Sequence, residues 1–175
     1  MRKEGSGRVT QHEAIETRLL RVAGFGLAHA VWCISDDEVL VPFLIQERDG
    51  NRQLVRLASE NLEDGVAEGR RRQRENPDEM ELAVLFCDGY VKIDGPQSDA
   101  IIVEGFEYES GLHALSIYQP YRPGKAGAGF AVLRPKFDFL TPLLMTAEQA
   151  SQAFFEGLYD HQQGSRVWDA CFVNE

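Results

Sequence analysis

The sequence predicts a single α+β domain: a central, mostly antiparallel sheet of about five to seven strands, with the N- and C-terminal helices packed on one face. Three observations favour this class. Apolar residues recur at helical spacing at both ends of the chain, short β-rich segments separated by turn residues fill its middle, and no linker or repeat divides the 175 residues. We therefore expect a frayed segment over 1–9 and one domain over 10–175.

The first helix is expected over residues 11–34. The segment 10–13 reads Thr-Gln-His-Glu, a capping box in which the threonine and glutamate side chains satisfy unpaired amides at a helix start. Apolar residues then follow at helical spacing, beginning with Ile15, Leu19 and Val22. Gly24 and Gly26 are unfavourable inside a helix, so they indicate either close packing against the sheet or a break.

A hairpin and a second helix come next. Strands are expected over 39–47 and 53–57, joined by an Asp-Gly turn, and Pro42 favours an edge position or a bulge for the first of them. A helix over 60–75 ends in the basic cluster Arg70, Arg71, Arg72 and Arg74. These cations complement the negative end of the helix dipole. The alternatives are an anion site, or pairing with the acidic sheet of a second copy.

The middle of the chain is typical of an antiparallel meander. Strands are expected over 80–87, 90–93, 100–109, 112–119 and 130–137, separated by turns rich in aspartate, glycine and proline. A third helix is expected over 146–163, opened by a second capping box and stopped at Gly164. A last strand is expected over 166–173.

Charge is concentrated in one stretch of this meander. Nine carboxylates and one base, Lys92, lie between Asp78 and Glu109, so the stretch carries most of the net charge of −10. This balance opposes binding to nucleic acid and to anionic lipid, which both require clustered lysine and arginine. A basic protein partner fits the field better. We therefore expect no nucleic acid and no membrane partner.

The sequence gives no sign of a cofactor or metal. The spacing of aspartates between Asp88 and Glu104 does not match a calcium loop, the glycine-rich segment 124–129 lacks the residues of a phosphate loop, and no paired-histidine zinc motif occurs. The three cysteines are odd in number and far apart, which is typical of reduced thiols. Without a long apolar run or a signal peptide, we expect a cytoplasmic protein, bacterial or otherwise.

One candidate catalytic face comes from strand register. A two-residue turn at Ser110-Gly111 would pair Tyr108 with His113, Phe106 with Leu115 and Glu104 with Ile117. One face would then hold Glu104, Tyr108 and His113 among apolar residues, and a glutamate there could act as a general base or line a small-molecule pocket. The simpler interpretation is that Glu104 pairs with an arginine or is turned outward by a bulge at Gly105.

These observations favour a non-enzymatic protein-binding or regulatory module, acting in the manner of small acidic inhibitor and immunity proteins. Carboxylates steer a basic partner and a few aromatic side chains anchor it. The candidate contacts are Glu79, Glu81, Tyr90, Glu107, Glu109, Tyr118 and Tyr121. The alternative is a small enzyme or ligand-binding domain that uses the Glu104, Tyr108 and His113 face. A homodimer is compatible with either function.

Overall fold

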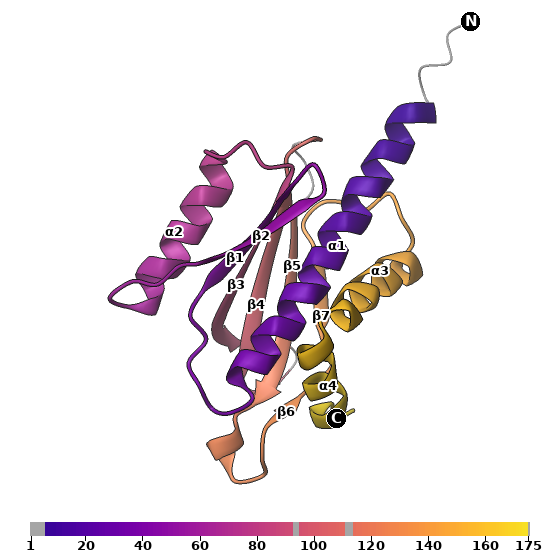
Figure 1. Ribbon diagram of the computed structural model, residues 1–175. Coiled ribbons are helices and arrows are strands. Elements are labelled where there is room, and N and C mark those ends of the chain that lie inside the picture. Colours follow the sequence, from indigo (N-terminus) through magenta and orange to yellow (C-terminus); the bar gives the residue numbers. More distant parts are fainter. Residues whose placement is uncertain (1–5, 93–94, 111–113, 175) are drawn as a thin grey trace, which may run out of the picture.

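The computed structural model describes residues 6–92, 95–110 and 114–174, with side chains from Ile15 onward (Figure 1). The elements in chain order are α1 (Ser6–Ile34), β1 (Phe43–Arg48), β2 (Asn51–Arg56), α2 (Leu62–Glu75), β3 (Leu82–Val91), β4 (Ser98–Glu107), β5 (Ala114–Arg122), the 3₁₀ turn η1 (Gly124–Ala126), β6 (Ala131–Val132), β7 (Lys136–Phe139), α3 (Ala147–Asp160) and α4 (Gln162–Cys171).

The strands form one antiparallel sheet, which confirms the expected fold class. Their order is β2-β1-β3-β4-β5-β6, and β7 also pairs with β5. The long helix α1 crosses one face of the sheet together with α3 and α4, and α2 packs on the other face against β3 and β1 (Figure 1). We call the face under α1 the inner face and the opposite one the outer face.

The main core lies between the inner face and α1. Alternate residues of the strands point into it, among them Ile45, Val84, Val103 and Ile117. The helix approaches closely because it carries glycines: a Cβ on Gly24 would lie 1.9 Å from the carbonyl oxygen of Phe154, and one on Gly26 would lie 2.1 Å from the ring of Phe86. The two glycines therefore allow close packing in an unbroken helix.

The ends of two predicted elements differ from the structure. Helix α1 begins at Ser6, so Thr10 lies inside the helix and the expected start near residue 11 is wrong. Pro42 precedes β1, which lies between β2 and β3 and is not an edge strand. The proline needs no amide hydrogen at this point, and its carbonyl oxygen accepts a 2.8 Å hydrogen bond from the amide of Leu57.

Two elements of the meander were also predicted wrongly. Asp88 and Gly89 do not form a turn, because β3 continues through them and pairs them with Ile101 and Ala100 of β4. The expected last strand over 166–173 is mostly helix α4. The expected segment 130–137 contains only the two-residue β6 and the start of β7, with Pro135 between them.

The stretch after α3 turns and continues as a helix. His161 ends α3 and caps α4, with its ring Nδ1 accepting the amide hydrogen of Gly164 at 2.9 Å. Gly164, read from the sequence as a stop signal, is needed for packing, since a Cβ there would lie 2.2 Å from the carbonyl oxygen of Ala28. None of the described helices is long and apolar enough to cross a membrane.

Candidate functional site

The outer face of the sheet is only partly covered. Helix α2 lies over β3 and β1 and forms a small core with Leu44, Ala83 and Leu85. The outward side chains of β4 and β5 lie beyond it, and Ile102, Phe106 and Tyr118 are only partly buried. This face carries Glu104 and Tyr108, the residues that sequence reasoning singled out.

The register of β4 and β5 differs from the predicted one by a single residue. Phe106 pairs with Ala114 and Glu104 with Ser116, whereas Leu115 lies opposite Gly105 on the inner face. A Cβ on Gly105 would lie 3.0 Å from Cγ of Leu115, so the glycine leaves the space that this leucine occupies. A shift of one residue moves side chains to the other face. The predicted face with Leu115 and Ile117 is therefore wrong.

Glu104 pairs with an arginine, which confirms the simpler of the two interpretations. Nε of Arg70 donates to one carboxylate oxygen at 2.9 Å and Nη2 donates to the other at 2.7 Å. The hydrogen bond to Glu104 raises the pKa of Arg70 above its usual value. The strand continues through Gly105 without a bulge. A carboxylate held by both ends of a guanidinium group is fixed in position and is poorly placed to act as a base.

Tyr108 is engaged elsewhere. Its hydroxyl donates a 2.8 Å hydrogen bond to the carbonyl oxygen of Gln73, near the end of α2, and burial raises its pKa to about 12. Four residues along a strand separate it from Glu104 by about 13 Å. His113 lies outside the described residues. The structure therefore does not bring the phenol and the carboxylate together.

The predicted partner contacts differ in how far their side chains are exposed to solvent. Glu79, Tyr90 and Glu109 are exposed, while Glu81 and Tyr118 are partly buried. Glu81 forms an ion pair with Arg18, whose hydrogen bond is the main cause of a lowered pKa for this carboxyl.

Two of the candidate contacts lie in the interior. Glu107 is 2% exposed and accepts a hydrogen bond from the amide of Ser110. Tyr121 is 8% exposed and donates to Asp88 at 2.9 Å. Both side chains support the fold and are not open to a partner.

The acidic stretch is divided by the fold. Strands β3 and β4 are ten residues long, or about 30 Å. Glu79, Glu81, Glu107 and Glu109 lie at or beyond one end of this strand pair, while Asp88 and Asp99 lie toward the other end. The net charge therefore does not form one continuous patch.

The basic cluster is largely neutralised by carboxylates of the same chain. Arg71 pairs with Glu68 and Glu75, Arg72 pairs with Glu68, and Arg70 pairs with Glu104. The two Arg71 contacts and the Arg72 contact lie three or four residues apart on the helix, as is typical of stabilising side-chain pairs.

A hollow lies between the N-terminal half of α2 and the outer face of β3 and β4. Its volume is about 510 Å³. Its apolar walls come from Leu62, Val66, Ala67 and Ile102, its charged or polar ones from Glu63, Arg70 and Cys87, and the strand at Asp88, Gly89 and Tyr90 completes it. We call it the Tyr90 hollow, after the last of these residues. The side chains of Asp88 and Tyr90 themselves leave β3 on the inner face, where Asp88 accepts a hydrogen bond from Tyr121.

The Tyr90 hollow is negatively charged once its own ion pair is taken into account. Arg70 is neutralised by Glu104. Glu63 has no ion pair with any residue in the described ranges. Burial raises the pKa of Asp88, against hydrogen bonds from Tyr121 and from the amide of Gly89.

The hollow is suited to binding rather than to nucleophilic chemistry. Burial raises the pKa of the Cys87 thiol to about 12, so the thiol stays protonated. A smaller hollow of about 280 Å³ lies beside the same ion pair, with Phe106 and Leu140 in its walls. Arg74 also lines it, so the smaller hollow does not share the acidic character of the Tyr90 hollow.

Sequence reasoning missed a cluster at the junction of α1, α3 and α4. His29 Nδ1 lies 3.1 Å from His161 Nε2, and Cys33 Sγ lies 3.6 Å from His29 Nε2. The histidines are 132 residues apart, so no local spacing could have joined them. Over the part of the chain that the structure describes, no group of three or more histidine, cysteine, aspartate or glutamate residues is placed to hold a metal ion.

Comparison with known proteins identifies no relative: no family model, no curated protein and no solved structure matches the chain.

Proposed function

We propose that this protein is a binding module that receives a basic side chain of a partner protein in the Tyr90 hollow. The observation that carries the proposal is the combination of an exposed carboxylate, Glu63, with apolar walls. Arg70, the cation of the hollow, is occupied by Glu104 and does not balance Glu63. A cation from outside the chain fits this arrangement.

Lysine and arginine match the hollow in both of their parts. Their long apolar stems pack on surfaces such as those of Val66 and Ile102, while their charged ends stay near water. The charged end would lie beside the Glu63 carboxylate. An unbalanced carboxylate at a rim also speeds the encounter with a basic partner.

The same proposal covers location and assembly. We propose a cytoplasmic location, which the free thiols of Cys33, Cys87 and Cys171 support. We expect no nucleic-acid partner, because the net charge of −10 opposes phosphate. A second copy of the chain is one potential source of the basic side chain, and sedimentation of the protein alone tests for a homodimer.

The proposal can be tested with a blocked peptide of alternating arginine and leucine, titrated into the isotopically labelled full chain. We expect saturable NMR shift changes at the amides of Val66, Gly89 and Ile102, and an affinity that falls as salt is added. The variant Glu63→Gln should weaken binding by about two- to fivefold, the effect of one rim charge.

Glu79→Gln is the matched control. This carboxylate is exposed and lies beyond the opposite end of β3, so its loss removes charge without touching the hollow. Equal weakening by Glu79→Gln would show that net charge alone attracts the peptide. Equal binding of a peptide of alternating glutamate and leucine would also overturn the proposal.

A further inference from the structure

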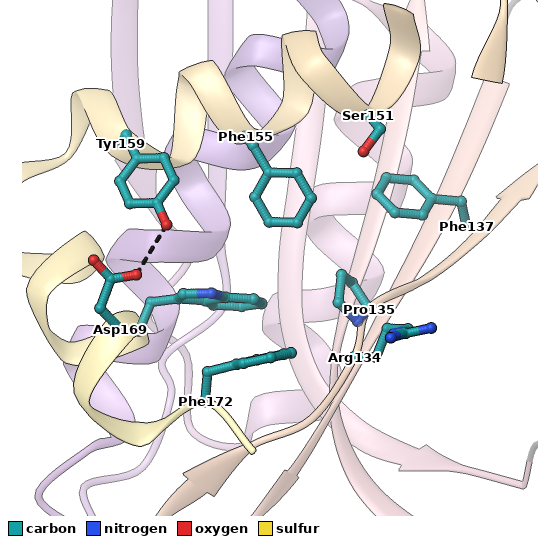
Figure 2. Close-up of a pocket in the computed structure, with 9 residues that line it drawn as sticks. Arg134, Pro135, Phe137, Ser151, Phe155, Tyr159, Asp169 and Phe172 are labelled. Carbon is teal, nitrogen blue, oxygen red and sulfur yellow. Dashed lines mark hydrogen bonds between the residues drawn. The ribbon is translucent and has the colours of Figure 1, made fainter. Parts of the chain in front are cut away.

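Another cavity lies on the inner side of the molecule, between α3, α4 and the chain leading into β7 (Figure 2). Its volume is about 550 Å³. Five of its nine lining residues are aromatic, namely Phe137, Phe155, Tyr159, Trp168 and Phe172. The others are Arg134, Pro135, Ser151 and Asp169. We call it the aromatic pocket.

The rings of the aromatic pocket form two walls at a steep angle. Trp168 and Phe172 are stacked, with centroids 5.9 Å apart and an angle of 16° between the rings. Phe155 of α3 meets Trp168 edge-on, at 6.4 Å and 72°. Trp168 is buried, whereas Phe172 is partly open to solvent. A flat ring entering here can stack on one wall and meet the other with its edge, the two arrangements that aromatic pairs prefer.

The walls are held in place by two hydrogen bonds. The amide of Val173 donates to the carbonyl oxygen of Val132 at 2.9 Å, which ties the end of α4 to the sheet. The hydroxyl of Tyr159 donates to Asp169 at 2.9 Å and links α3 to α4 (Figure 2). A site whose walls are fixed before binding loses less entropy when a ligand enters.

One end of the aromatic pocket carries a cation without a charged partner. Nη2 of Arg134 donates to the neutral side chain of Asn174 at 3.0 Å, and no carboxylate of the described chain forms an ion pair with it. Asp169, the one carboxylate of the pocket, lies at the opposite end in Figure 2 and already accepts from Tyr159. The guanidinium group is therefore free to bind an anion.

We infer that the aromatic pocket binds a flat aromatic carboxylate. The ring stacks against the wall of Trp168 and Phe172 with Phe155 at its edge, and the carboxylate accepts hydrogen bonds from Arg134. A pocket with mainly apolar walls and a few placed polar groups is typical of small-molecule sites, and a guanidinium group matches a carboxylate in shape as well as in charge. This site is separate from the Tyr90 hollow, and neither proposal depends on the other.

The test uses three probes, namely benzoate, 2-naphthoate and indole-3-carboxylate, each compared with its uncharged amide. Titration calorimetry with the full chain gives the affinities. Quenching of Trp168 fluorescence in the Trp32→Phe background locates the site, because Trp32 is the other tryptophan of the chain. We expect at least one carboxylate to bind saturably and about tenfold more tightly than its amide, as a charged hydrogen bond implies.

Arg134→Gln should abolish the preference for the carboxylate over the amide, with the affinity for the amide unchanged. Arg166→Gln is the matched control, because it removes the same charge from an exposed position on α4 that does not line the pocket. Phe172→Ala should weaken both forms of the ligand, since it removes a ring from one wall.

Several outcomes would overturn the inference. These are an absence of saturable binding by all three carboxylates at millimolar concentration, equal affinity for carboxylate and amide, or an unchanged preference in Arg134→Gln. Binding that leaves Trp168 fluorescence unaltered would also contradict it, because the ligand would then lie elsewhere. Circular dichroism of each variant checks that the chain is folded.

Discussion

His161 joins three helices through the two nitrogens of its ring. Nδ1 accepts the amide hydrogen of Gly164, so the ring proton lies on Nε2 and is donated to Nδ1 of His29. His29 then carries its own proton on Nε2, facing the sulfur of Cys33. Burial lowers the pKa of both histidines, and the charges of His161 and Arg56 lower that of His29 further. The arrangement therefore requires two neutral rings.

Acid should weaken the fold through these histidines. Because their pKa values are lower in the folded state than the ordinary 6.5, the unfolded chain binds more protons as the pH falls below that value. We expect the free energy of unfolding to decrease from about pH 6.5 downward, by at most about 1.4 kcal/mol per pH unit for each excluded proton. Urea unfolding between pH 5 and pH 8 measures this slope.

His161→Asn separates titration from capping. The asparagine oxygen can accept the amide hydrogen of Gly164, as a helix N-cap should, but it does not titrate in this range. We expect the variant to show a shallower pH slope with most of the stability at pH 8 retained. A slope equal to that of the unaltered protein would show that other groups cause the acid sensitivity.

At the scale of elements, α1 and α3 cross at a distance that only glycine permits. A Cβ on Gly157 would lie 2.0 Å from the carbonyl oxygen of Arg21, and the backbone on both sides would have to move. We expect Gly157→Ala to lower the free energy of unfolding by about 1–3 kcal/mol, because the cost of overpacking exceeds the gain of about 1 kcal/mol in helix propensity. Urea denaturation provides the measurement.

Gly69→Ala is the control for this prediction. Gly69 also lies inside a helix, but a Cβ there would meet the ends of Leu85 and Leu57, at 2.5 and 2.8 Å. Leucine side chains can turn aside, whereas a carbonyl group in a helix cannot, so this variant should lose less stability. If both alanines cost the same, the close backbone contact at Gly157 is not what limits the packing of α1 on α3.

The sequence predicted most helices and strands because their signals are local. Helical spacing identified α1, α2 and α3, and the alternation of apolar residues identified the central strands. Two of the failures involve glycines whose role is tertiary. Gly89 resembles a turn residue, but a Cβ there would lie 2.7 Å from Ile102 on the neighbouring strand, and Gly164 resembles a helix stop but packs on α1.

The candidate site was harder to predict, because it depends on register. That Glu104 needs a partner follows from its apolar neighbours, but only the fold brings Arg70 of α2 to it. A one-residue difference in pairing, decided by the fit of Leu115 beside Gly105, moved Leu115 and Ile117 of the predicted face to the inner side. The Tyr90 hollow and the aromatic pocket each combine residues from separate elements of the fold, and no short sequence motif marks either of them.

For the molecule as a whole, the two faces of the sheet are stabilised unequally. The inner face shares one large apolar core with α1, α3 and α4. The outer face under α2 rests on a cluster of four buried residues, Leu44, Leu57, Ala83 and Leu85. The residues that α2 itself buries are Gly65, Gly69 and Gln73, which offer little apolar surface. Since burial of apolar area is the main stabilising contribution, α2 should be the less firmly held layer.

Native-state hydrogen exchange should resolve this difference between the layers. Helix α3 is the matched comparison, because it also has 14 residues but buries Ala150, Ala153, Phe154, Gly157 and Leu158. We expect amides in the middle of α2 to exchange through local opening, at least about tenfold faster than those of α3 after correction for sequence. Low urea should leave the α2 rates nearly unchanged, since local opening exposes little surface. If α2 instead exchanges at the rate of α3, the two layers unfold together and the wall of the Tyr90 hollow is as rigid as the core.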